Sequence, residues 1–300
     1  MMRIHAGIAA AALALALPAA AQRDWSKVEI RTTKLGETTY MMEGAGGNLG
    51  LSIGDDAVFL IDDQYAPLSE KITAAIAKLT PKPVRFVVNT HWHFDHTGGN
   101  ENFGKAGAIV VAHENVRHRL SSDQFLEFFK ITEKAPPKGA LPVVTFAGSV
   151  TFHLNGDEMR VMHVPRAHTD GDAMVHFVNT DVIHTGDVFW NGIFPFIDTA
   201  SGGTIDGTIA ACDRALAIAK DSTRIIPGHG PLSDKAGLKA YRDMLAVVAE
   251  RIGKLVAAGK SPEEVEAAKP LADLDGKWGK GGIKTDTFAR MIAHNILKNR

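Results

Sequence analysis

The stretch NTHWHFDHTGGN, residues 89–100, places three histidines and an aspartate within six positions and follows them with two glycines. It comes directly after VRFVV, a β-branched run typical of a buried strand. Neutral imidazoles and a carboxylate are costly to bury together, unless divalent cations compensate for the lost hydration. A solvated polar turn is the alternative interpretation. The pattern favours a metal site built from His91, His93, Asp95 and His96.

Three further side chains of metal-binding type follow at loop positions after runs that are typical of strands. They are His168 in PRAHTDGD, Asp187 in IHTGD and His229 in IPGHG. Their presence makes a solvated turn the weaker interpretation of the first motif.

These seven residues resemble the hallmark of the metallo-β-lactamase fold superfamily, which is His-x-His-x-Asp-His followed by a distant His, Asp and His. The match is complete and in order, and its context runs from about Val28 to about Val256. The resemblance implies an α/β protein with an αββα sandwich of two mixed sheets flanked by helices, and with metals at one sheet edge. It also implies that His91, His93 and His168 hold one metal, that Asp95, His96 and His229 hold another, and that Asp187 bridges both.

The order of segments favours the same architecture. The runs VEIRTTKLGETTYMME and NLGLSIGDDAVFLIDD are typical of hairpins, and helices are predicted near residues 68–79, 123–130, 206–220 and 238–252. The sequence SPEE is a capping box that begins a further helix at residue 261. We therefore expect one hydrolase domain over residues 22–260, with a helical extension over residues 261–300 packed on it.

The first 21 residues have the pattern of a cleaved signal peptide. Arg3 precedes an apolar run over residues 6–17, and three alanines end at Ala21, where cleavage is predicted. A retained membrane anchor is the alternative, but this run is shorter than the ~20 residues that a spanning helix needs. We expect a periplasmic or secreted protein without stable membrane insertion.

Composition limits the other partners. The chain of 300 residues has a formal net charge of -1 and 45% hydrophobic residues, which is typical of a globular enzyme. A chain with this charge balance has no broad cationic field, so we do not expect it to bind nucleic acid. We expect a small-molecule substrate instead. Cys212 is the only cysteine, which excludes an internal disulfide, and its helical spacing predicts that it is buried.

The resemblance also implies a mechanism. Two cations can share a water, lower its pKa towards neutral and present hydroxide as the nucleophile, while Asp95 orients it and carries a proton to the leaving group. The seven donors are all nitrogen or oxygen, which suits two Zn2+ ions and also accommodates iron or manganese.

Aromatic residues near the ligands are the candidates for substrate contact. We expect Trp92, Trp190 and Phe194 to form part of the wall, with ordinary core packing as the alternative for each. The glycine-rich segment of residues 41–48 is expected to overhang the site.

Asp187 helps to choose among reactions. In the best-known subclass of zinc β-lactamases a cysteine takes this place and a lysine follows three residues later, where this chain has Trp190. An aspartate bridge resembles the thioesterase, lactonase and phosphodiesterase branches. We therefore predict an exported binuclear hydrolase of an ester, lactone, thioester or cyclic amide. The alternatives are a β-lactamase and an oxidoreductase like the mononuclear iron sulfur dioxygenases.

Overall fold

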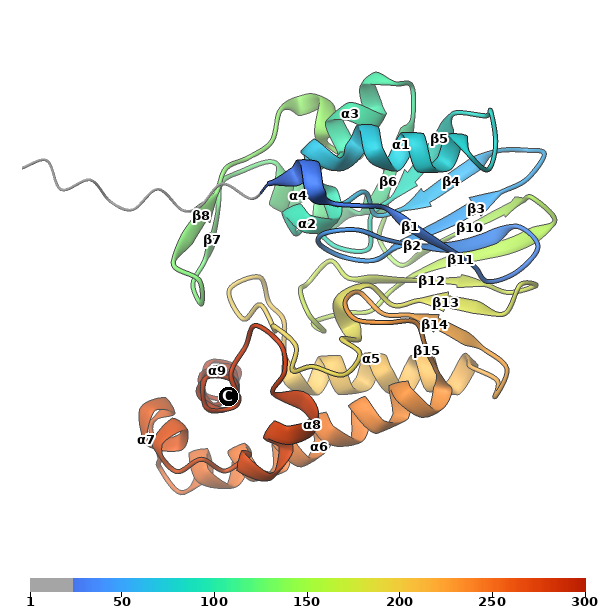
Figure 1. Ribbon diagram of the computed structural model, residues 1–300. Coiled ribbons are helices and arrows are strands. Elements are labelled where there is room, and N and C mark those ends of the chain that lie inside the picture. Colours follow the sequence, from blue (N-terminus) through green and yellow to red (C-terminus); the bar gives the residue numbers. More distant parts are fainter. Residues whose placement is uncertain (1–23) are drawn as a thin grey trace, which may run out of the picture.

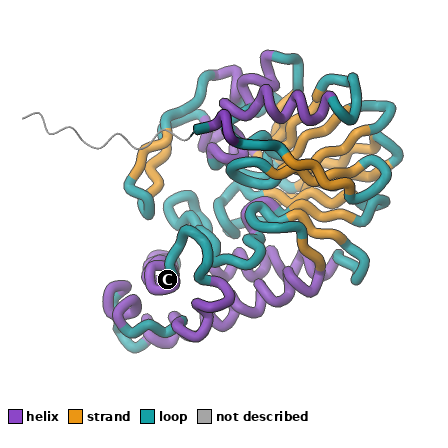
Figure 2. Tube along the Cα trace, viewed as in Figure 1, coloured by secondary structure: helices purple, strands orange, loops and turns teal. Residues whose placement is uncertain are grey.

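The computed structural model describes residues 24–300, so the predicted signal peptide lies outside the described residues. Two mixed β-sheets stack face to face and helices cover both outer faces (Figure 1), which confirms the expected αββα sandwich. The strands gather between two helical layers (Figure 2). Their facing sides enclose a shared apolar core that includes Phe59, Val161 and Val175.

The first sheet carries the opening motif at the end of a central strand. Its order is β1-β2-β3-β4-β5-β6-β9, with antiparallel pairing from β1 to β4 and parallel pairing from β4 to β9. All four residues of β4 are buried, as expected for a strand covered on both faces. The strands are β1 (Arg31–Lys34), β2 (Thr39–Glu43), β3 (Leu49–Ile53), β4 (Val58–Ile61), β5 (Val84–Val88), β6 (Ile109–His113) and β9 (Val144–Phe146).

The second sheet brings the downstream ligands to the same edge. Its order is β10-β11-β12-β13-β14-β15, and only β13 and β14 pair in parallel. Asp187 follows β13 and His229 follows β14, so the parallel pairing puts both at one end of the sheet. The strands are β10 (Ser149–Leu154), β11 (Asp157–His163), β12 (Ala173–Phe177), β13 (Val182–His184), β14 (Arg224–Ile226) and β15 (Ser233–Asp234).

The helices form the outer layers, and those after residue 260 share a core with the second layer. One buried cluster contains Leu238 of α6, Val265 of α7, Trp278 of α8 and Phe288 of α9. The capping box at Ser261 is present at the start of α7. The helices are α1 (Ser69–Ala77), α2 (Phe94–Thr97), α3 (Asn100–Lys105) and α4 (Glu114–Leu120) over the first sheet, then α5 (Ile205–Ile218), α6 (Lys235–Ala257), α7 (Pro262–Ala267), α8 (Asp275–Trp278) and α9 (Thr285–Lys298).

The helix predicted near residues 123–130 is wrong. That segment forms a two-stranded hairpin of β7 (Gln124–Leu126) and β8 (Ile131–Glu133), which stands apart from the two main sheets (Figure 1). Phe125 is exposed while Leu126 is buried, which is the alternation of a strand. Lys130 has a φ of 54°, a left-handed conformation that turns the chain and does not continue a helix.

The helix predicted near residues 68–79 is shorter in the structure, where α1 spans Ser69–Ala77. Ile72 and Ile76 are buried, but Leu79 lies beyond the end of the helix and is exposed. Within residues 24–300, no helix combines the length and the apolar character needed to cross a membrane.

Removing the ring of Phe288 should destabilise the whole domain. This side chain is fully buried, and its ring stacks on Phe194 with centroids 4.5 Å apart. Phe288→Ala is expected to lower the free energy of unfolding by about 3–5 kcal/mol in urea denaturation. Leu297→Ala is the control on the same helix, because Leu297 is 43% exposed and should change stability by no more than about 0.5 kcal/mol. Equal unfolding midpoints for both variants would show that α9 is not part of the core.

Candidate metal centre

All seven candidate ligands lie at one edge of the sandwich, although they come from four separate segments. His91 and His93 follow β5, and Asp95 and His96 belong to the short helix α2. The remaining three follow β11, β13 and β14; they are His168, Asp187 and His229.

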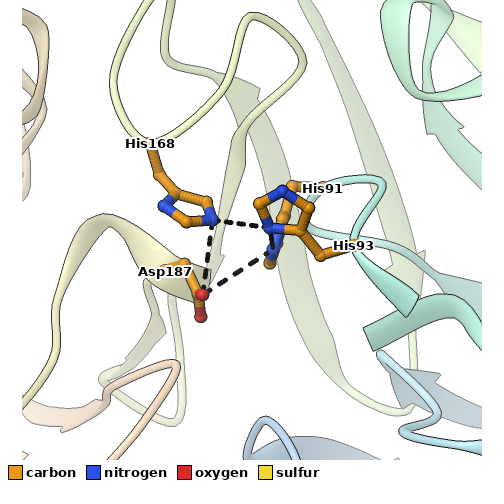
Figure 3. A group of neighbouring side chains, drawn as sticks. All are labelled: His91, His93, His168 and Asp187. Carbon is orange, nitrogen blue, oxygen red and sulfur yellow. Dashed lines mark hydrogen bonds and ion pairs between the residues drawn. The ribbon is translucent and has the colours of Figure 1, made fainter. Parts of the chain in front are cut away.

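The first group consists of three imidazoles and one carboxylate (Figure 3). The His93 Nδ1 atom lies 3.1 Å from His91 Nε2 and 2.8 Å from His168 Nε2. The Oδ2 atom of Asp187 lies 3.7 Å from His91 Nε2 and 3.4 Å from His168 Nε2. All four side chains are buried.

The second group lies against the same carboxylate. It consists of Asp95, His96 and His229, whose ligand atoms lie within 4.8 Å of one another. The Oδ1 atom of Asp187 lies 3.1 Å from His96 Nε2, and its Oδ2 atom lies 3.4 Å from His229 Nε2. Asp187 therefore contacts ligand atoms of both groups.

Two buried carboxylates orient histidines from behind. Asp198 Oδ2 lies 3.1 Å from His93 Nε2, and Asp62 Oδ2 lies 2.8 Å from His96 Nδ1. Each carboxylate accepts a hydrogen bond from the ring nitrogen that points away from the site. The opposite nitrogen therefore faces the site and is the one available to a metal.

The other two histidines of the first group are oriented by a hydroxyl and by a backbone carbonyl. Thr90 Oγ1 donates to Asp62 and accepts from His91 Nδ1 at 3.0 Å. His168 Nδ1 donates to the carbonyl of Phe196 at 2.7 Å. Both rings therefore direct the lone pair of Nε2 into the site.

This arrangement fits divalent cations. The His93 Nδ1 atom lies 3.1 Å from His91 Nε2 and 2.8 Å from His168 Nε2, so three imidazole nitrogens converge on one point. Asp187 Oδ1 is buried and has no hydrogen-bond partner among residues 24–300. Such crowded acceptors repel one another and are costly to bury unless positive charge lies between them. Their nitrogen and oxygen donor set suits zinc.

Electrostatics keep the first group ready for a metal. Burial lowers the pKa of His168 to about 4, and burial followed by the charge of His96 sets the pKa of His91 well below its usual value. Burial alone would raise the pKa of Asp187, but the surrounding imidazoles, His229 first, hold it well below the ordinary value. His91 and His168 are therefore neutral and Asp187 is ionised, which is the state that metal ligands require.

In the second group, the carboxylates oppose the effect of burial. Burial favours neutral His96 and His229, yet the charge of Asp187 raises the pKa of both. The space next to the Asp187 carboxylate therefore favours a positively charged group.

The glycine-rich segment of residues 41–48 packs against the second group. A Cβ atom added at Gly47 would overlap the ring of His96. Gly46 has a φ of +98°, a left-handed conformation that favours glycine, and its Cα lies against Asp95. These glycines let the backbone approach the ligands closely.

Only one of the three expected wall residues lies where it was predicted. Trp190 lines a cavity of about 190 Å³ above the ligands. The prediction for Trp92 and Phe194 is wrong: they are 2% and 1% exposed and pack in the hydrophobic core. Both have large rings that bury much apolar surface, which favours a place in the core between neighbouring elements.

Sequence reasoning missed the supporting carboxylates Asp62 and Asp198. Each had a weak signal, since Asp62 directly follows the buried strand β4 and Asp198 ends the aromatic run FPFID. An acid at such a place is also a common turn former, so the sequence did not distinguish the two roles.

Comparison with known proteins agrees with this geometry. The model of a family described as the metallo-beta-lactamase superfamily matches residues 46–229. The chain therefore belongs to the metallo-β-lactamase superfamily and has hydrolase relatives.

Two curated relatives show how similar this chain is to hydrolases. An acyl-coenzyme A thioesterase, MBLAC2 of Bos taurus, is 24% identical over 158 residues, which are 47% of this chain and 54% of the relative. A hydroxyacylglutathione hydrolase of Nitrosococcus oceani is 26% identical over 184 residues, which are 59% and 60% of the two chains. The chain spans about half the length of the curated relatives it matches.

Solved structures share the fold. A metallo-β-lactamase from Pontibacter korlensis superposes with a TM-score of 0.60 at 21% identity, covering 73% of this chain and 99% of that one. The sec-alkylsulfatase Pisa1 from Pseudomonas sp. gives a TM-score of 0.66 at 19% identity, covering 90% of this chain and 51% of that one. At these identities the likeness establishes the architecture.

Removing the carboxylate of Asp187 should release metal from both groups. Asp187→Ala is expected to reduce bound zinc from about two equivalents to less than about one, since each group loses a contact with the shared carboxylate. Inductively coupled plasma analysis after gel filtration measures this content. Asp213→Ala removes an exposed carboxylate of α5 that pairs with Arg242, and should keep full metal content. Full content in Asp187→Ala would contradict the bridging role.

A methyl group at Gly47 should affect the second group alone. Gly47→Ala pushes the His96 ring out of place, so bound zinc is expected to fall from about two equivalents to about one. Gly148→Ala is the control, because its Cβ would meet no described atom within 4 Å. Loss of both equivalents, or of neither, would show that the two groups do not bind separately.

Proposed function

We propose that this protein is an exported binuclear metallohydrolase that cleaves an ester, lactone, thioester or cyclic amide of a small-molecule substrate. The observation that carries the proposal is the position of Asp187, whose carboxylate lies against ligand atoms of both groups: His168 of the first group, and His96 and His229 of the second. A carboxylate shared in this way is the arrangement expected for two neighbouring cations.

The proposed cofactors are two Zn2+ ions, and iron or manganese would also match the donor atoms. His91, His93 and His168 would hold one ion, Asp95, His96 and His229 would hold the other, and Asp187 would contact both. When bound, such ions supply Lewis acidity that activates water and polarises the scissile carbonyl.

Asp95 is the proposed proton carrier. Its side chain is 18% exposed and lines the cavity, whereas the side chain of Asp187 is 3% exposed. A carboxylate open to the cavity can take a proton from the attacking water and give it to the leaving group. Asp187 is enclosed by imidazoles and is suited to holding charge in place.

Relatives and the N-terminal pattern support the remaining parts of the proposal. The relatives include an acyl-coenzyme A thioesterase and hydroxyacylglutathione hydrolases, which favours carbonyl substrates with a thiol or alcohol leaving group. The pattern over residues 1–21 supports export, with cleavage after Ala21.

Isotope labelling tests the proposed chemistry. The zinc-loaded protein is assayed on a panel of esters, lactones, thioesters and cephalosporins in water enriched in ¹⁸O. Mass spectrometry of the product acid should show one labelled oxygen, because hydrolysis adds one oxygen from water to the acyl carbon. Activity should disappear with a chelator and return with added zinc.

The rival oxidoreductase gives a different result. One tightly held iron, oxygen consumption and turnover of a persulfide would favour the sulfur dioxygenase alternative. Hydrolysis that continues unchanged in chelator would contradict the metal-dependent mechanism.

A further inference from the structure

The walls of the catalytic cavity differ in chemistry from its floor. The floor consists of candidate ligands, namely His93, Asp95, Asp187 and His229. The walls are entirely aromatic or aliphatic; they are Tyr65, Phe94, Leu126, Phe129, Trp190 and Phe196. Within the described chain, neither a lysine nor an arginine lines this cavity.

Charged side chains of both signs line a different cavity. This space of about 280 Å³ between the β7–β8 hairpin and α9 is lined by Lys130 and Arg290, and also by Glu127, Asp198 and Glu263. Phe196 lines both cavities and lies between them. An anionic end of the acyl group would find no lysine or arginine on these walls to pair with, so only cations held at the floor could attract it.

The β7–β8 hairpin supplies the part of the wall that is open to solvent. Leu126 is 2% exposed, but Phe129 is 48% exposed although it lines the cavity. The ring of Phe129 lies 4.9 Å from that of Phe196, which anchors the hairpin tip at this edge of the site. A half-exposed phenylalanine at a cavity gains stability when an apolar group covers it.

Phe125 provides an internal comparison. It lies on the same hairpin and is 56% exposed, yet it is not among the residues that line the cavity. Alternation along β7 turns Leu126 towards the cavity and Phe125 towards solvent, and Phe129 reaches the cavity from the turn that follows β7.

We propose that the catalytic cavity takes a neutral, apolar acyl group, and that Phe129 of the β7–β8 hairpin is a specificity-determining residue that covers this group. This inference rests on the proposed hydrolase function. Water would add to the acyl carbon, the bond to the leaving sulfur or oxygen would break, and the leaving group would take up a proton. The volume of about 190 Å³ lies below the usual range of drug-sized pockets, which suits an unbranched aliphatic acyl chain and not a bulky group.

A matched series of thioesters tests the preference. Acetyl, hexanoyl and succinyl groups are each carried on methanethiol, so the leaving group is constant while the acyl group is short, apolar or anionic. The zinc-loaded wild type should favour hexanoyl over succinyl by at least about tenfold in kcat/KM. A preference for succinyl would overturn the inference.

Two hairpin variants locate the contact. Phe129→Ala should raise KM for the hexanoyl thioester by about tenfold, while kcat for this substrate and the kinetics of the acetyl thioester change by less than about twofold. The reason is that the Phe129 ring would stabilise the bound substrate and the transition state equally, so its loss weakens binding alone. Phe125→Ala should leave all three substrates unchanged. Equal effects of both variants, or no effect of Phe129→Ala, would assign the specificity elsewhere.

A binding measurement separates this inference from the proposed function. Calorimetric titration of the metal-free protein with hexanamide and with succinamate requires no turnover. Hexanamide should bind the wild type more tightly than succinamate does, and Phe129→Ala should lose this difference. If hexanamide shows this preference but no ester, lactone or thioester is hydrolysed, the proposed reaction is wrong and the inference about the apolar cavity is supported. If hydrolysis occurs without any preference for hexanamide, the cavity inference is wrong.

Discussion

The carboxylate of Asp187 is the group on which the rest of the site depends. It is almost fully buried at the point where the two sheets end, and four imidazoles surround it. A lone buried carboxylate would be protonated or would destabilise the fold, because its hydration is lost. Here the imidazoles hold its pKa low, and the remaining negative charge raises the pKa of His96 and His229. The site is thus built around a fixed negative charge, and the nitrogen atoms are arranged about it.

Hydrogen bonds on the side of the histidine rings that points away from the site hold the ligand nitrogens in place. Asp62 serves two ligands at once, since it contacts His96 directly and reaches His91 through Thr90. Asp198 and the carbonyl of Phe196 do the same for the other two rings of the first group. Each bond fixes the orientation of its ring, so the same nitrogen faces inwards before any ion arrives. This preorganisation lowers the cost of binding.

The same edge of the sandwich also determines what the substrate meets. The ligands lie on the floor of a cavity whose other walls are apolar, and the β7–β8 hairpin closes one side of it. Phe196 connects the two roles: its carbonyl orients His168, and its ring packs against Phe129 of the hairpin. Metal geometry and substrate selection are therefore linked through one loop, which lies between β13 and α5.

The sequence by itself determined the fold class and the candidate ligands. The period-2 and helical patterns are local, so the hairpins before residue 62 and the helices α1, α5 and α6 were predictable from them. The spacing of the motif at residues 91–96, with His168, Asp187 and His229 downstream, indicated a shared site because such residues are costly to bury singly. The tertiary structure decided the rest. It turned residues 124–133 into a hairpin, placed Trp92 and Phe194 in the core, and brought Asp62 and Asp198 behind the histidines. These outcomes depend on contacts between segments far apart in the chain. The type of a residue does not by itself predict which distant side chain it will contact.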